Sequence, residues 1–123
     1  MYKSLEDMPP QCPPADVIAG DKEPVFRFIV GDSLDEIDFL NHVERNIQYP
    51  PAKKCESLAL SFMTEESAVK LMQQKFPKFR KMNVAKGRIT KDCGVHNIQR
   101  QHLNLWLFKD VEMMNIFIEG EET

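Results

Sequence analysis

The sequence lacks any hydrophobic run of the roughly 18 residues that a membrane-spanning helix requires. Its first residues, MYKSLEDMPPQCPP, contain acids and prolines where a signal peptide has a hydrophobic stretch. The three cysteines, Cys12, Cys55 and Cys93, are an odd number at wide separations, so neither a disulfide framework nor a CxxC metal site is indicated. We therefore expect a cytoplasmic protein that does not associate with membranes and whose cysteines are reduced thiols.

Motifs of the familiar enzyme classes are also missing. The sequence contains no GxGxxG, Walker loop, HExxH, GxSxG or paired CxxC. His42, His96 and His102 have no metal-ligand spacing relative to one another or to the cysteines, so we expect no metal site. The residues themselves indicate no cofactor, and they leave open whether the protein is an enzyme.

What is present is the composition of one globular domain. The chain has 123 residues, of which 42% are hydrophobic and 28% are charged. Prolines at 9, 10, 13 and 14 and the lack of periodicity predict an extended or mobile N-terminal arm over residues 1–23. We expect a single α+β domain over residues 24–119 and an acidic C-terminal tail over 120–123.

Local patterns predict alternating strands and helices in the first part of the domain and strands in the second. The expected strands span residues 24–30, 58–62, 82–89, 102–108 and 116–118. One expected helix spans about 34–46, after the capping-box pattern Ser33-Leu-Asp-Glu36, and a second follows Thr64 and ends before Pro77. The result is a small twisted sheet, mixed or mainly antiparallel, of about five strands with two helices. The loop 48–56 is long for such a domain and is a candidate functional edge.

Charge is unevenly distributed along the chain, although the net charge is only −3. Residues 67–91 contain eight of the 16 basic residues and no acidic one, whereas residues 1–46 contain ten acidic and four basic residues. The simplest interpretation is a set of solvated faces that attract one another within the fold. The alternative is that the basic segment binds an anionic partner such as a nucleotide or RNA. Its candidate binding residues are Lys78, Arg80, Lys81 and Arg88.

Three further side chains have both a structural and a functional interpretation. Arg27, within Val-Phe-Arg-Phe-Ile, either faces solvent or recognises an anion from a rigid strand. Ser61, at the end of a strand, either satisfies local backbone groups or contacts a ligand. Trp106 is expected in the core rather than as a stacking platform, because its neighbours are leucines and not basic residues.

Several motifs together resemble those of short bacterial proteins of an uncharacterised family. These are Phe26-Arg27, Gly31-Asp32-Ser33, Asp38-Phe39-Leu40, Leu60-Ser61-Phe62 with Thr64-Glu65-Glu66, Phe76-Pro77 and His102-Leu-Asn-Leu-Trp106. The resemblance covers about residues 25–108 and implies no activity.

A second similarity is to the ADP-ribosyltransferase-like fold, which includes the RNA 2′-phosphotransferases. In one branch of that fold, an arginine on the first strand, a serine at the end of a second strand and a late E-x-E surround NAD, and Arg27, Ser61 and Glu119-Gly-Glu121 occur here in that order. The resemblance implies that Arg27 holds pyrophosphate, Ser61 positions the nicotinamide ribose and Glu121 stabilises the oxocarbenium-like centre. NAD is the cofactor under this alternative.

Two functional hypotheses follow. The first is a non-catalytic interaction or accessory protein of bacterial type that presents the basic segment 67–91 and the proline-rich arm to a protein partner. The second is a small ADP-ribosyltransferase-like domain that binds NAD or a related nucleotide.

Overall fold

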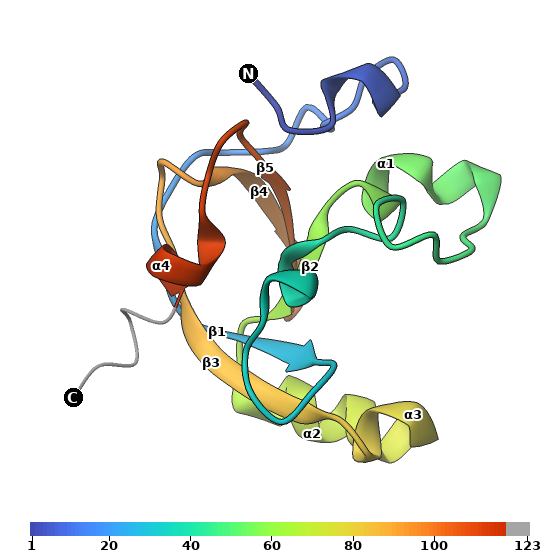
Figure 1. Cartoon of the computed structure of the whole chain (residues 1–123), viewed down its shortest axis with the longest axis vertical. Coiled ribbons are helices and arrows are strands. Elements are labelled where there is room, and N and C mark those ends of the chain that lie inside the picture. Colours follow the sequence, from blue (N-terminus) through green and yellow to red (C-terminus); the bar gives the residue numbers. More distant parts are fainter. Residues whose placement is uncertain (118–123) are drawn as a thin grey trace.

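An open antiparallel sheet of five strands organises the chain, which confirms the predicted α+β class (Figure 1). The structure is a computed structural model that describes residues 1–117. The strands are β1 (Lys22–Ile29), β2 (Leu60–Met63), β3 (Asn83–Ile89), β4 (Gly94–Gln99) and β5 (His102–Leu107). Their order across the sheet is β3-β1-β2-β5-β4, so β3 and β4 are the edge strands.

The helices that cover this sheet are short. The described residues contain α1 (Lys54–Ser57), α2 (Glu66–Lys75), α3 (Pro77–Arg80) and α4 (Met113–Phe117), together with the 3-10 helices η1 (Leu5–Asp7), η2 (Glu36–Phe39) and η3 (Pro51–Lys53). Figure 1 shows α2 and α3 at one end of the molecule, beside β1 and β3, and the N-terminal segment with α1 at the other end.

The helix predicted over residues 34–46 is wrong, because only η2 forms there. A capping box is present, but Asp35 and Asp38 form it. Farther along, Asn41 and Glu44 each accept a hydrogen bond from the backbone N–H of the other. Side chains therefore satisfy the backbone groups that a longer helix would have used, which is how Asp and Asn compete with helical hydrogen bonding. The loop expected over 48–56 is also partly helical, since it contains η3 and the first residues of α1.

The C-terminal part of the sheet differs from the prediction in one strand. The strands expected over 82–89 and 102–108 are confirmed as β3 and β5. The strand expected over 116–118 is wrong, since Phe117 ends α4, and residue 118 lies outside the described residues. The fifth strand is instead β4, in a segment for which we expected none. Tertiary packing of Phe117 overrides the strand preference of its β-branched neighbours.

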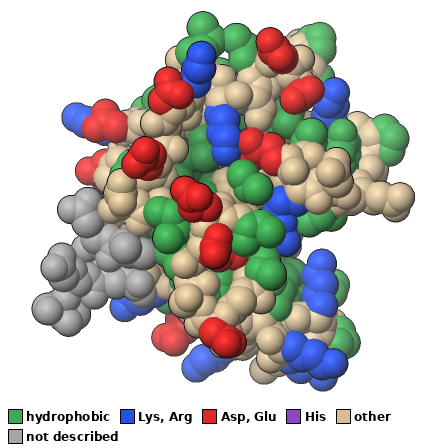
Figure 2. Space-filling model, in the orientation of Figure 1, with side chains coloured by type: hydrophobic (Ala, Val, Ile, Leu, Met, Phe, Trp, Pro, Cys, Tyr) green, Lys and Arg blue, Asp and Glu red, His purple; other side chains and the backbone are tan. Residues whose placement is uncertain are grey.

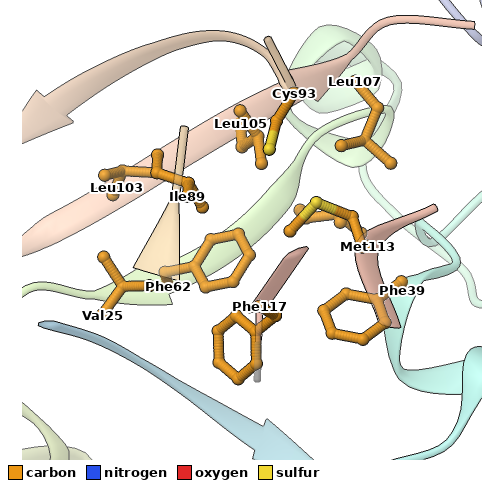
Figure 3. Close-up of a cluster of buried hydrophobic side chains, with 11 residues drawn as sticks. Val25, Phe39, Phe62, Ile89, Cys93, Leu103, Leu105, Leu107, Met113 and Phe117 are labelled. Atoms are coloured by element: carbon orange, nitrogen blue, oxygen red, sulfur yellow. The ribbon is translucent and has the colours of Figure 1, made fainter. Parts of the chain in front are cut away.

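One face of the sheet carries the main hydrophobic core. Figure 3 shows the rings of Phe39, Phe62 and Phe117 directed toward one another, with Val25 and Ile89 beside them. The Phe117 ring centroid lies 5.5 Å from that of Phe39 and 5.9 Å from that of Phe62. Because Phe62 and Phe117 are fully buried, this cluster fixes α4 and η2 on the sheet.

The opposite face is covered by two separate clusters. At one end, Ala68 and Val69 of α2 pack on Phe26 and Met63. At the other end, Trp106 packs with residues of α1 and of the N-terminal arm. The middle of this face belongs to neither cluster.

The N-terminal arm follows the sheet and is bonded to it. Ile18 and His96 exchange two backbone hydrogen bonds, of 2.9 and 2.8 Å, and a disulfide joins Cys12 to Cys55. The prediction of three reduced thiols is therefore wrong for Cys12 and Cys55, because folding brings together cysteines that are 43 residues apart. Cys93 keeps a free thiol and is buried. The arm, predicted to be extended or mobile, is in contact with the domain, and its last two residues, Lys22 and Glu23, begin β1.

We expect Gly87→Ala to destabilise the fold, because a Cβ atom at Gly87 would lie 2.6 Å from Cδ2 of the Phe117 ring and even closer to the Phe117 carbonyl oxygen. Overpacking of this kind costs about 1–3 kcal/mol of unfolding free energy, which urea denaturation measures. Gly31→Ala is the matched control, since no atom lies within 4 Å of the corresponding Cβ. Equal stability of the two variants would contradict close packing of α4 on β3.

Candidate functional site

Arg27 lies at the junction where β1 meets β2. The two strands pair at one position, Phe26 opposite Met63. Beyond it, the Arg27 guanidinium donates from Nε to the Asp38 carbonyl oxygen at 2.5 Å and from an Nη atom to the Ser61 carbonyl oxygen at 2.6 Å. Its carbon centre lies 5.4 Å from the centroid of the Phe62 ring. Arg27 thus ties β1, η2 and β2 together.

The electrostatic environment of Arg27 is that of a structural group. Desolvation by burial lowers its pKa to about 10, against an opposing effect of Asp38, so the side chain stays charged at neutral pH. Asp38 is 1% exposed, and its carboxylate accepts hydrogen bonds from the backbone N–H groups of Val30 and Asp35. Two N–H groups of the guanidinium, at Nε and at one Nη, are thus already bonded to carbonyl oxygens of this chain.

The geometry does not bring Arg27 and the Ser61 hydroxyl together. Arg27 lies over Phe62, and successive side chains of a strand point to opposite faces, so the Ser61 side chain is on the other face of the sheet. Glu121 lies outside the described residues. The arrangement therefore provides no observation in favour of the NAD-binding alternative.

We expect Arg27→Ala to lower the unfolding free energy by about 2–4 kcal/mol, because it leaves the carbonyl oxygens of Asp38 and Ser61 without their donor. Arg80→Ala is the control, since it also removes two hydrogen bonds to carbonyl oxygens but at an exposed site, and should cost at most about 1 kcal/mol. Urea denaturation compares the two. An Arg27→Ala variant as stable as wild type would contradict the role of this side chain in joining β1, η2 and β2.

A polar groove occupies the middle of the sheet face, between α2 and the N-terminal arm. It has a volume of about 510 Å³. Ser61, Asn97 and Asn104 lie in one row of the sheet, since Ser61 pairs with Asn104 and Asn104 with Asn97. Gln99 and His102 form the adjacent row. The walls include Pro14 and Asp16 of the arm, and Lys53 and Glu56 of η3 and α1.

Hydrogen bonds organise the floor of the groove. Asn104 donates to Asn97, and Asn97 donates to the Asp16 carboxylate, both at 3.2 Å. Desolvation lowers the pKa of His102, while a hydrogen bond with Asn104 acts in the opposite direction. The pKa of His42, at the rim, is also lowered, first by desolvation and then by nearby cations, of which Arg45 is the largest contributor. Both imidazoles are therefore neutral at pH 7 and can donate and accept hydrogen bonds.

A second surface, the basic cap, consists of α2, α3 and the following residue Lys81, and it carries five of the eight basic residues of the predicted segment 67–91. Figure 2 shows Lys and Arg side chains gathered where these helices lie, whereas Asp and Glu are more numerous over the rest of this view. Lys70, Lys75, Lys78 and Lys81 are exposed. The two ion pairs formed within residues 1–117 are Lys3–Glu44 and Lys53–Glu56, so these four lysines have no ion pair in that part of the chain.

The four predicted binding residues have different environments. Arg80 donates to the carbonyl oxygens of Gln73 and Gln74, so it closes the C-terminal end of α2. Lys78 lies over the Phe79 ring, with Nζ 4.9 Å from its centroid. Lys81 follows α3 and is exposed. Arg88 is separate from the other three, since it lies on β3 and donates to the Ile116 carbonyl oxygen.

Hydrophobic side chains are exposed among the lysines of the cap. Leu71 is 47% exposed and Phe76 is 46% exposed. Leu71 lies on α2 beside Lys70 and one turn before Lys75, which places charge and apolar area side by side. The sequence predicted the charge of this surface but not its apolar part, because helical periodicity does not show which apolar side chains stay exposed.

The polar groove was missed from the sequence. The signal was the alternation of polar and apolar residues in His102–Leu107, which predicts one polar face of a strand. Because no strand was expected over residues 94–99, the sequence did not show that Asn97 and Gln99 continue this polar face. Trp106 is 1% exposed, so its predicted place in the core is correct.

Within residues 1–117, no helix has both the length and the apolar character that crossing a bilayer demands. Nor does that part of the chain bring three His, Cys, Asp or Glu side chains together as metal ligands.

Comparisons of the chain with protein-family models, with curated proteins and with solved structures find no match.

Stability should fall as the pH drops below about 6.5, because the folded protein disfavours protonated histidine. His96 is 4% exposed, its Nδ1 has no hydrogen-bond partner among the described residues, and desolvation and Lys22 lower its pKa below 6.5. At pH values between the lowered pKa and 6.5, the unfolded chain binds more protons than the folded chain. The free energy of unfolding therefore has its full value above pH 6.5 and decreases as the pH falls through this range. His42 and His102, whose pKa values are also lowered, add to the slope.

Urea denaturation between about pH 7 and pH 5.5 measures this dependence. His96→Leu should reduce the slope, and replacement of all three histidines should flatten it. An unchanged slope in His96→Leu would contradict the assignment to this residue.

Proposed function

We propose that this protein is a non-catalytic interaction protein whose basic cap binds an acidic segment of another protein. The observation that carries the proposal is the combination, on one small surface, of four lysines without an ion pair in residues 1–117 and the exposed side chains of Leu71 and Phe76. Exposed lysines alone are ordinary features of a soluble surface. Exposed apolar area beside them is what a protein interface adds.

An acidic protein segment suits this surface better than RNA does. The whole chain has a net charge of −3, so a long polyanion would be repelled by the rest of the molecule. The arginine of the cap, Arg80, is engaged by α2 and is not free to form the bidentate contacts that phosphates favour. A short segment with glutamates and an apolar side chain would match both the lysines and the exposed hydrophobic residues.

The proline-rich arm has a smaller part in this proposal. Cys12 is bonded to Cys55, and Ile18 is paired with His96, so much of the arm is held against the sheet. A cytoplasmic location remains a prediction from the sequence. The disulfide favours a compartment in which cysteine pairs stay oxidised.

Reversing two charges of the cap should weaken binding of an acidic partner. We expect Lys78→Glu with Lys81→Glu to reduce the affinity for a fluorescein-labelled peptide of glutamate and leucine by about tenfold or more. Arg80 is left unchanged because its loss would also open the end of α2. Fluorescence anisotropy measures the affinity as a function of salt concentration.

The matched control is Lys91→Glu with Lys109→Glu, which changes the net charge equally at two exposed lysines outside the cap. This pair should change the affinity much less than the cap pair. Leu71→Ser with Phe76→Ser should weaken peptide binding while all charges are kept. Equal losses with the two charge pairs, or tighter binding of a single-stranded RNA than of the peptide, would refute the proposal.

A further inference from the structure

The polar groove is assembled from side chains that both donate and accept hydrogen bonds. Its floor and rim contain the amides of Asn97, Gln99 and Asn104, the imidazole of His102 and the hydroxyl of Ser61. Each amide has two N–H donors and a carbonyl acceptor, so the two bonds of the Asp16–Asn97–Asn104 chain use only part of this capacity. Hydrogen-bonding groups therefore remain for a ligand.

The floor is also held in place before any ligand binds. Asn97 is 6% exposed and is fixed by Asp16 on one side and Asn104 on the other. Both asparagines lie on neighbouring strands, which position side chains more rigidly than loops do. The volume of about 510 Å³ lies in the range of sites for small molecules.

The charges around the groove argue against an anionic ligand. Lys53 is the one lysine of the lining, and its Nζ lies 4.0 Å from a carboxylate oxygen of Glu56. Asp16 of the arm adds a second negative charge to the lining. A phosphate group would thus meet two carboxylates and one lysine that is already paired.

The burial of the Trp106 ring argues against a planar nucleobase as the ligand. Recognition of a nucleobase relies on stacking against an exposed aromatic face. Trp106, the indole that contributes to the lining, is 1% exposed and donates from Nε1 to the Cys55 carbonyl oxygen. Its ring is therefore covered by the packing of α1 and the arm.

We propose that the polar groove binds a small uncharged polyhydroxyl ligand, a sugar of one or two rings, between walls that the Cys12–Cys55 disulfide holds together. Hydroxyl groups both donate and accept hydrogen bonds, which matches a lining of amides, imidazoles and a serine. This inference concerns a different surface from the basic cap and does not depend on the proposed function.

The disulfide matters because it joins the two walls. Pro14 and Asp16 follow Cys12 closely in the arm, and Lys53 and Glu56 lie on either side of Cys55. The buried Trp106 ring also holds Cys55 in place, because its Nε1–H donates a hydrogen bond to the Cys55 carbonyl oxygen. Reduction would remove the covalent link between the arm and α1, while the Ile18–His96 hydrogen bonds would still hold the arm to β4. We therefore expect the oxidised protein to bind the ligand more tightly than the reduced protein.

The test is an NMR titration of the oxidised full chain with D-glucose, D-galactose, D-mannose, N-acetyl-D-glucosamine and lactose. At least one sugar should produce saturable shifts in the side-chain amide signals of Asn97, Gln99 and Asn104. Ser61→Ala with Gln99→Ala should weaken that sugar about tenfold or more. Gln74→Ala, which removes an exposed amide on α2, is the control and should have no effect.

Two further variants test the role of the walls. Cys12→Ser with Cys55→Ser should weaken saturable binding, with circular dichroism used to verify folding. If this variant does not fold, Asp16→Ala tests the same wall with the disulfide intact and should weaken binding about tenfold. Full affinity in a folded Cys12→Ser, Cys55→Ser variant, or in Asp16→Ala, would overturn the role of the walls.

The ligand class has its own test. Parallel titrations with inorganic phosphate and with AMP should leave the three amide signals unchanged. Shifts with phosphate or AMP and none with the sugars would overturn the assignment of an uncharged ligand, as would the absence of saturable shifts with every sugar.

Discussion

The hydrogen bonds of Arg27 hold together the two halves of a sheet that is otherwise weakly joined. On one side, β1 pairs with β3 over most of its length, and on the other, β2, β5 and β4 form continuous ladders. Between them, β1 and β2 pair at a single position. The guanidinium continues this connection, since it bonds to the Ser61 carbonyl oxygen of β2 and to the Asp38 carbonyl oxygen of η2. A fixed planar donor is suited to bridging two carbonyl groups, which a lysine could not do with the same geometry.

The incomplete cover of one sheet face explains where the polar groove lies. Residues at alternate positions of β2 show the change along that face: Met63 is buried under α2, Ser61 lines the groove, and Ala59, just before the strand, packs under the arm. A surface in the middle that is not covered by a helix must be compatible with water, and amides with a hydroxyl meet this requirement. The arm replaces a helix as the cover at one end, where the disulfide attaches it to α1.

The two candidate surfaces lie in different parts of the molecule and suit different partners. The basic cap is charged and partly apolar, which favours a flexible acidic chain. The groove has neutral imidazoles, two carboxylates and one lysine, which favours a small uncharged molecule over an anion. Arg27 contributes a side chain to neither surface, but it is bonded to β2, which carries Ser61 of the groove and precedes α2 of the cap.

The sequence by itself determined the fold class and most of the strands, because short-range patterns of hydrophobic residues and turn residues predict strands locally. It also determined that half of the basic residues lie in residues 67–91. The tertiary structure alone decided the pairing of Cys12 with Cys55, the assignment of the edge strand to Gly94–Gln99 and the helical end at Phe117. It also decided that Arg27 and the Ser61 side chain lie on opposite faces. These features result from contacts between residues far apart in the chain, and local propensity contains no information about which distant groups will meet.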